Sequence, residues 1–150
     1  MANFTKMFWL NSMGGLTMSK LTSILVITAL TGCAWLTPTA PFDPVEYSAI
    51  NKIFTNAEWY KSDCADQAMS KQNFFELKKE SQFLVNYSAD LPHNDITKSM
   101  TINLDKVVDE AYKAYSANEP RTKFYCTLKL NAIRDAAGTI KSAVAQRRRP

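Results

Sequence analysis

The chain has 150 residues, of which 46% are hydrophobic, and its formal net charge is +4. Two of its 18 basic residues, Lys6 and Lys20, precede residue 33, so the rest of the chain carries 16 basic and 14 acidic residues and a charge of +2. This length suits one domain with a core of modest size. The near-neutral charge argues against nucleic acid as a partner, since phosphate binding needs basic residues spread over a face.

The first feature along the chain is a short apolar segment, Leu21–Leu30, with the positive charge of Lys20 directly before it. Ten residues are too few to span a bilayer, which needs roughly 20, but they suit the core of a signal peptide. The segment ends in the run Leu30, Thr31, Gly32, Cys33.

This four-residue run resembles the lipobox of bacterial lipoproteins. The resemblance implies that residues 1–32 are a signal peptide and that Cys33 becomes the lipidated first residue. Because Met18, Ser19 and Lys20 would already make a compact charged start, Met18 is an alternative to Met1 as the start of translation. Two or three acyl chains such as palmitate anchor a protein stably without spanning the membrane. The alternative is a buried N-terminal helix in which Cys33 is an ordinary apolar residue.

The residue after Cys33 is Ala34 and not aspartate, which bears on localisation. In lipoproteins of Gram-negative bacteria an aspartate there commonly marks retention in the inner membrane. The resemblance therefore implies an outer-membrane location facing the periplasm in a Gram-negative source. In a Gram-positive source, the anchor would lie on the outer face of the only membrane.

Residues 33–43 form a proline-rich tether, and a helical domain is expected over residues 44–150. Pro38, Pro41 and Pro44 favour extended backbone, and ten such residues reach about 30 Å. The first helix is predicted over 44–67, with Asp43 as its cap and Glu46 returning a capping hydrogen bond. Its apolar stripe recurs at spacings of three and four and comprises Ile50, Ile53, Ala57, Tyr60 and Cys64.

Three more helices follow in the predicted order. The second begins at a Ser70 cap and ends before Leu91, unless one unbroken helix runs over 44–90. The polar stretch 92–101 is predicted to be a loop, with or without a short helical turn. The third helix covers 104–115, and the fourth begins near Asn118 or Arg121. Four helices with short connections predict an all-α, bundle-like domain.

Cys64 and Cys126 are the two cysteines left after Cys33, and an exported protein favours a disulfide between them. Reduced, buried cysteines are the alternative, which would require a cytoplasmic location. The disulfide would set antiparallel first and fourth helices in register. The pairs predicted to face each other are Tyr60 with Leu130, Ala57 with Ile133, Ile53 with Ala137, and Ile50 with Ile140.

The sequence predicts no catalytic residue, cofactor or metal site. The single histidine, His93, lies beside Asp95 in a polar stretch without a second ligand at a characteristic spacing. No glycine-rich phosphate loop and no nucleophile elbow are present. The alternative function is a periplasmic enzyme or ligand-binding protein with its site near His93.

Surface contacts are the leading functional expectation. Adjacent aromatic residues cannot both face one core, so some aromatic surface should be exposed; the pairs are Trp59 with Tyr60, Phe74 with Phe75, and Phe124 with Tyr125. Arg147, Arg148 and Arg149 are candidates for contact with anionic envelope material. We therefore expect a non-enzymatic, membrane-anchored domain that binds another envelope protein or has a structural role.

Overall fold

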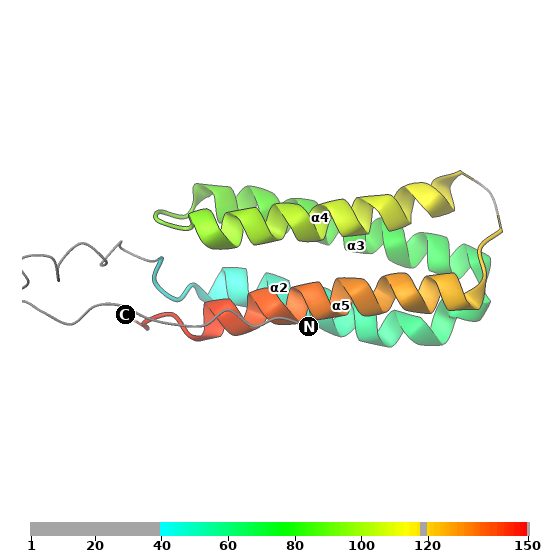
Figure 1. The fold of residues 1–150 in the computed structure, drawn as a ribbon, viewed down its shortest axis with the longest axis horizontal. Coiled ribbons are helices and arrows are strands. Elements are labelled where there is room, and N and C mark those ends of the chain that lie inside the picture. The colour runs from blue at the N-terminus through cyan, green and yellow to red at the C-terminus, as the bar shows by residue number, and fades with distance from the viewer. Residues whose placement is uncertain (1–39, 118–119, 150) are drawn as a thin grey trace, which may run out of the picture. The chain divides into compact units, whose positions relative to one another are not determined.

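The computed structural model describes residues 40–117 and 120–149. The predicted signal peptide, Cys33 and most of the predicted tether therefore lie outside the described residues. Within them the chain is helical and has no strand, in the order α2 (Pro44–Trp59), η1 (Tyr60–Ala65, a 3-10 helix), α3 (Gln67–Asp90), α4 (Asp95–Ser116) and α5 (Lys123–Ala145). The predicted all-α, bundle-like fold is confirmed (Figure 1).

The bundle consists of two antiparallel helix pairs, α2 with α5 and α3 with α4 (Figure 1). Packing between the two pairs, at α4 with α5 and at α2 with α3, is less extensive. The start of α2, the α3–α4 turn and the end of α5 meet at one end, which we call the tether end. The opposite end carries η1 and the two cysteines, and we call it the disulfide end.

One continuous core fills the space between the four helices. Phe74 of α3 and Tyr115 of α4 are fully buried and their rings stack with centroids 4.9 Å apart. Each fully buried large apolar side chain contributes about 1.5–3 kcal/mol. The predicted stripes supply most of the core, whose helical members include Ile50, Ile53, Ala57, Leu77, Leu84, Leu104, Val108, Ala111, Leu130, Ile133, Ala137, Ile140 and Val144.

The first helix starts as predicted but ends earlier. The Asp43 carboxylate accepts a hydrogen bond from Glu46 N at 2.7 Å, which confirms the cap. The α-helix ends at Trp59 rather than at residue 67, and the 3-10 helix η1 continues the chain to Ala65. The change to 3-10 winding accompanies the placement of Cys64 in the core.

The predicted Ser70 cap of the second helix is wrong. Asp66 is the cap, because its carboxylate accepts hydrogen bonds from Ala68 N at 2.8 Å and Met69 N at 3.0 Å. Ser70 is buried inside α3, where its hydroxyl donates to the Asp63 carbonyl. Because a new helix begins after the Asp66 cap, the alternative of a single unbroken helix over 44–90 is also wrong.

The predicted loop over 92–101 is right for residues 92–94 and wrong for the rest, because α4 begins at Asp95. Its first turns bury Thr97 and Thr101, which continue the stripe of Leu104 toward the N-terminus. Threonine has a polar hydroxyl and a weak helix preference. A search for apolar residues at helical spacing therefore does not detect this part of the buried stripe. The Thr101 hydroxyl is satisfied by the Lys98 carbonyl at 2.9 Å.

An ionic cluster joins α3 to α4. Lys78 Nζ lies 3.0 Å from Asp105 Oδ2 and 3.1 Å from Asp109 Oδ1, and Ser81 donates to Asp105 at 2.6 Å. Partial burial disfavours the charged amine, but the hydrogen bonds to both carboxylates outweigh it and raise the pKa of Lys78. Hydrogen bonds from Lys113 and Lys78 lower the pKa of Asp109.

Contacts along the α2–α5 pair test the predicted register. Phe54 faces Gly138, where an added Cβ would lie 3.3 Å from the Phe54 ring. The side chain of Asn51 accepts a hydrogen bond from Lys141 at 2.9 Å. Glu58 pairs with Arg134 at 2.9 Å. Each of these pairs is offset by two positions from the predicted facing pairs, so the helices are antiparallel and in register to within about half a turn.

Candidate functional site

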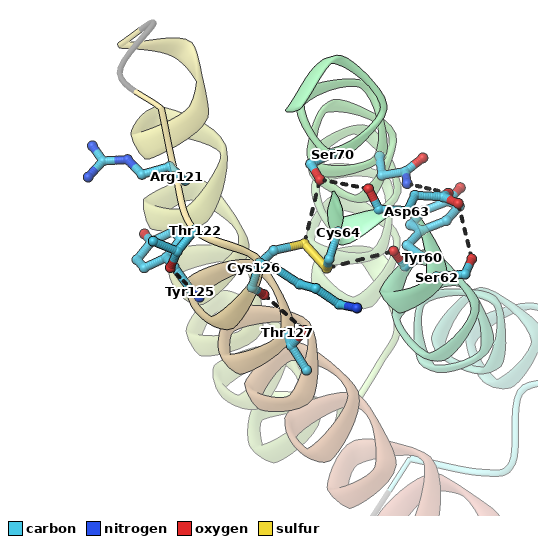
Figure 2. The surroundings of a disulfide bond; sticks show 12 residues. Tyr60, Ser62, Asp63, Cys64, Ser70, Arg121, Thr122, Tyr125, Cys126 and Thr127 are labelled. Carbon is cyan, nitrogen blue, oxygen red and sulfur yellow. Dashed lines mark hydrogen bonds between the residues drawn. A yellow bond between two sulfur atoms is a disulfide. The ribbon is translucent and has the colours of Figure 1, made fainter. Parts of the chain in front are cut away.

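The disulfide end is organised around Cys64 and Cys126, whose sulfur atoms are at bonding distance and whose Cα atoms are 5.6 Å apart. The predicted pairing is therefore confirmed. Figure 2 shows the bond between η1 and the first turn of α5, with the Ser70 hydroxyl beside it. Ser70 Oγ lies 3.6 Å from Cys126 Sγ. Thr122 caps α5 by accepting from Tyr125 N at 3.1 Å, so this helix begins slightly later than predicted.

A buried polar network closes the tether end. Glu46 is fully buried, and its carboxylate accepts hydrogen bonds from Ser88 at 2.9 Å, Asn94 at 2.8 Å and Arg147 at 2.6 Å. Arg147 also donates to Asn94 Oδ1 at 2.6 Å and to Thr97 Oγ1. The predicted return bond of Glu46 to its own helix cap is thus replaced by a network that joins α2, α3, α4 and the end of α5.

This network determines which of the three arginines at positions 147–149 are accessible at the surface. The Arg147 side chain is only 10% exposed and forms a salt bridge with Glu46, so its charge is already neutralised inside the domain. Arg148 and Arg149 remain exposed, and the Arg149 guanidinium lies 5.3 Å from the centre of the Phe42 ring. Arg148 and Arg149 are the members of the tail that stay accessible for an anionic surface.

The last residues of the predicted tether pack onto the same end. Ala40 is buried, and its N–H donates to the His93 carbonyl at 3.1 Å. The Phe42 N–H donates to the Arg148 carbonyl at 2.9 Å. Backbone hydrogen bonds therefore fix where the tether joins the domain, next to the C-terminal segment.

His93 occupies the tight α3–α4 turn with a positive φ of 57°. Its side chain is exposed and lines a shallow pocket of about 280 Å³ together with Ala40, Asn94, Ile96, Thr97, Ala143, Gln146 and Arg147. The polar groups of Asn94, Thr97 and Arg147 are already used by the Glu46 network. Among residues 40–117 and 120–149, no group of His, Cys, Asp or Glu has the arrangement of a metal site.

Large apolar side chains remain on the surface although the core is filled. Each adjacent aromatic pair is divided as predicted: Phe74 is buried while Phe75 is exposed, and Trp59 and Phe124 are more exposed than Tyr60 and Tyr125. Phe83 of α3 is 52% exposed. The sequence contains a signal for the exposure of Phe83: its neighbour Leu84 is also apolar, and Leu84 takes the inward position.

A surface groove between α2 and α3, the α2–α3 groove, has a volume of about 520 Å³. Its lining residues are Pro44, Val45, Ser48, Ala49 and Lys52 of α2 and Glu76, Lys79, Glu80 and Phe83 of α3. Val45 and Phe83 supply exposed apolar surface. Sequence reasoning missed this groove, because it depends on how closely α2 and α3 pack.

Tyr87 lies one turn beyond Phe83 on α3, with the two rings stacked at 5.9 Å. Its hydroxyl donates to the Asp43 carboxylate at 3.1 Å. Burial and this hydrogen bond raise the pKa of Tyr87. The phenol therefore remains a neutral donor that ties the start of α2 to α3.

No helix within the described part of the chain is both long enough and apolar enough to cross a membrane. Comparison with known proteins finds no family model, no curated protein and no solved structure that matches this chain.

Proposed function

We propose that this protein is a lipid-anchored protein of the bacterial cell envelope whose helical domain binds another envelope protein and performs no catalysis. Cys33 is the anchor, and the segment that follows it links the membrane to the tether end of the domain. In a Gram-negative cell the domain faces the periplasm from the outer membrane, because Ala34 stands where a retention aspartate would be.

The observation that carries the binding role is exposed apolar surface on a domain with a closed core. In the described residues every buried side-chain nitrogen or oxygen has a hydrogen-bond partner, while Trp59, Phe83 and Phe124 are half exposed or more. Monomeric proteins rarely leave contiguous apolar patches uncovered, and such patches commonly mark protein interfaces. The α2–α3 groove brings two exposed apolar side chains, Phe83 and Val45, together on a concave surface.

Two further features support the envelope location. The disulfide is stable in oxidising compartments outside the cytoplasm. The tether joins the bundle at the end where Arg148 and Arg149 are exposed, which suits contact with anionic headgroups at about 1 kcal/mol per arginine. A lipid at Cys33 would keep this end nearest the membrane.

Metabolic labelling with a palmitate analogue tests the anchor. We expect label on the wild-type chain, cleavage before residue 33, and membrane fractionation, all of which are lost in Cys33→Ser. A full-length, unlabelled, cytosolic protein would overturn the proposal.

Chemical cross-linking in intact cells tests the binding role. We expect one discrete heteromeric adduct in the membrane fraction. A chain that gives only monomer under conditions that cross-link a known envelope complex would count against a protein partner. Binding of a small molecule with protection of His93 would favour the ligand-binding alternative.

A further inference from the structure

We propose that the α2–α3 groove is the docking site for an amphipathic helix of the partner, one with an apolar stripe flanked by acidic residues. This inference rests on the proposed function and specifies the surface and the partner chemistry. It starts from the shape of the groove, which lies where two helix pairs of the bundle pack less extensively.

The apolar part of the groove matches one face of a helix. Val45 and Ala49 stand one turn apart on α2, and Phe83 faces them from α3. The lining of α2 extends from Pro44 to Lys52, a length of about 12 Å or two helical turns. An amphipathic helix places its apolar residues at spacings of three and four along such a stripe, which is the usual way a helix binds in a groove.

The charged side chains at the rim of the groove indicate which charge the residues beside the partner's apolar stripe should carry. Lys52 on the α2 side is 66% exposed, whereas its partner Glu80 is 15% exposed. Lys79 on the α3 side is 58% exposed, whereas its partner Glu76 is 35% exposed. The ammonium groups are thus the more accessible charges on both walls of the groove, Lys52 on α2 and Lys79 on α3.

The carboxylates are also occupied by other donors. Asn56 Nδ2 lies 2.9 Å from Glu80 Oε1, and Gln72 donates to Glu76 at 2.9 Å. An approaching partner can therefore compete for the lysines while the acids keep their amide hydrogen bonds. Complementary rim charges of this kind mainly set orientation and association rate, and the apolar contacts at Phe83 supply most of the affinity.

Site-specific photo-cross-linking in intact cells tests this docking site on the full-length protein. A photoreactive phenylalanine analogue replaces Ser48 in the groove, Phe124 at the disulfide end, or Thr139 on the exposed face of α5. We expect a strong adduct at Ser48, with the cross-linked peptide, sequenced by mass spectrometry, showing an apolar helical stripe between acidic residues. The Thr139 position serves as the control and should give little adduct.

Two matched pairs of variants then test the contacts. Phe83→Ala should reduce the Ser48 adduct about 30-fold, whereas Phe124→Ala, which removes another exposed phenylalanine, should not. Replacing both Lys52 and Lys79 by glutamine should reduce it about fivefold, whereas Lys98→Gln on α4 should not. All of these side chains are exposed, so melting temperatures should remain close to that of the wild type.

Each other outcome overturns the groove proposal and has its own meaning for the function. An adduct at Phe124 but not at Ser48 leaves a protein-binding role and moves it to the disulfide end. A Ser48 adduct with lipid, with a second copy of the chain, or with a basic peptide rejects the acidic helix. Absence of adducts at all three positions rejects the groove, and it rejects the protein-binding function as well when chemical cross-linking also gives only monomer.

Discussion

Replacing Arg147 by alanine should strongly destabilise the domain, although Arg147 is near the C-terminus of the chain. Glu46 is fully buried and Arg147 is its only cationic partner among the described contacts. Removing one member of a buried ion pair leaves an uncompensated charge and costs about 3–5 kcal/mol. That is a large part of the roughly 5–15 kcal/mol by which a typical domain is stable.

Urea unfolding followed by circular dichroism measures this loss on the chain from residue 38, where the compact helical unit begins. Arg148→Ala is the matched control, because Arg148 is exposed, and it should change stability by less than about 0.5 kcal/mol. The double variant Glu46→Met, Arg147→Met should recover part of the loss, since it leaves no unpaired buried charge, although Ser88 and Asn94 lose their carboxylate acceptor. Equal stability of Arg147→Ala and Arg148→Ala would refute the reasoning.

Four other predictions concern the disulfide, the ionic cluster around Lys78 and the two exposed arginines. Reduction of Cys64–Cys126, which closes a separation of 62 residues, should cost about 4 kcal/mol by the loop-entropy estimate; equal melting of the oxidised and reduced chains would contradict it. The pKa of Asp109 is lowered from its ordinary value of 3.8 by hydrogen bonds from Lys113 and Lys78, so its contribution is present above that pH and is lost as the pH falls through the lower native value. Asp109→Asn should therefore flatten the pH dependence of unfolding below about pH 3.8, with Asp90→Asn as the control. Lys78→Met should lower stability at neutral pH, because Asp105 and Asp109 lose a shared cation, and a variant as stable as the wild type would show that this cluster contributes nothing. Arg148→Ala with Arg149→Ala should weaken binding to anionic vesicles and leave binding to neutral vesicles unchanged; unchanged binding to both would remove the arginine contact.

Periodicity and the cysteine pair were sufficient to predict the bundle. The stripes of α2 and α5 consist of residues whose hydropathy is unambiguous, such as Ile53 and Ile133, and the disulfide limits their relative shift. The start of α4 was missed because threonines occupy its buried positions. The end of α2 was misplaced because the change to 3-10 winding carries no Gly or Pro signal.

The candidate site was less predictable than the fold. Glu46 sits where a capping box would use it, and local spacing cannot show that Arg147, 101 positions later, competes for its carboxylate. The exposed aromatic residues were anticipated because two adjacent helix positions cannot face the same core. The α2–α3 groove was not anticipated. It depends on the distance between two helices, and the apolar pattern of one helix does not determine that distance.

The chain enters and leaves the bundle at the tether end, on the neighbouring helices α2 and α5. A mechanical load applied between the two backbone ends would therefore peel these helices apart turn by turn, starting at the Glu46–Arg147 pair, instead of shearing all their contacts at once. Peeling would stop at the covalent bond between Cys64 and Cys126. Everything between the two sulfurs, including all of α3 and α4, would stay outside the path of the force.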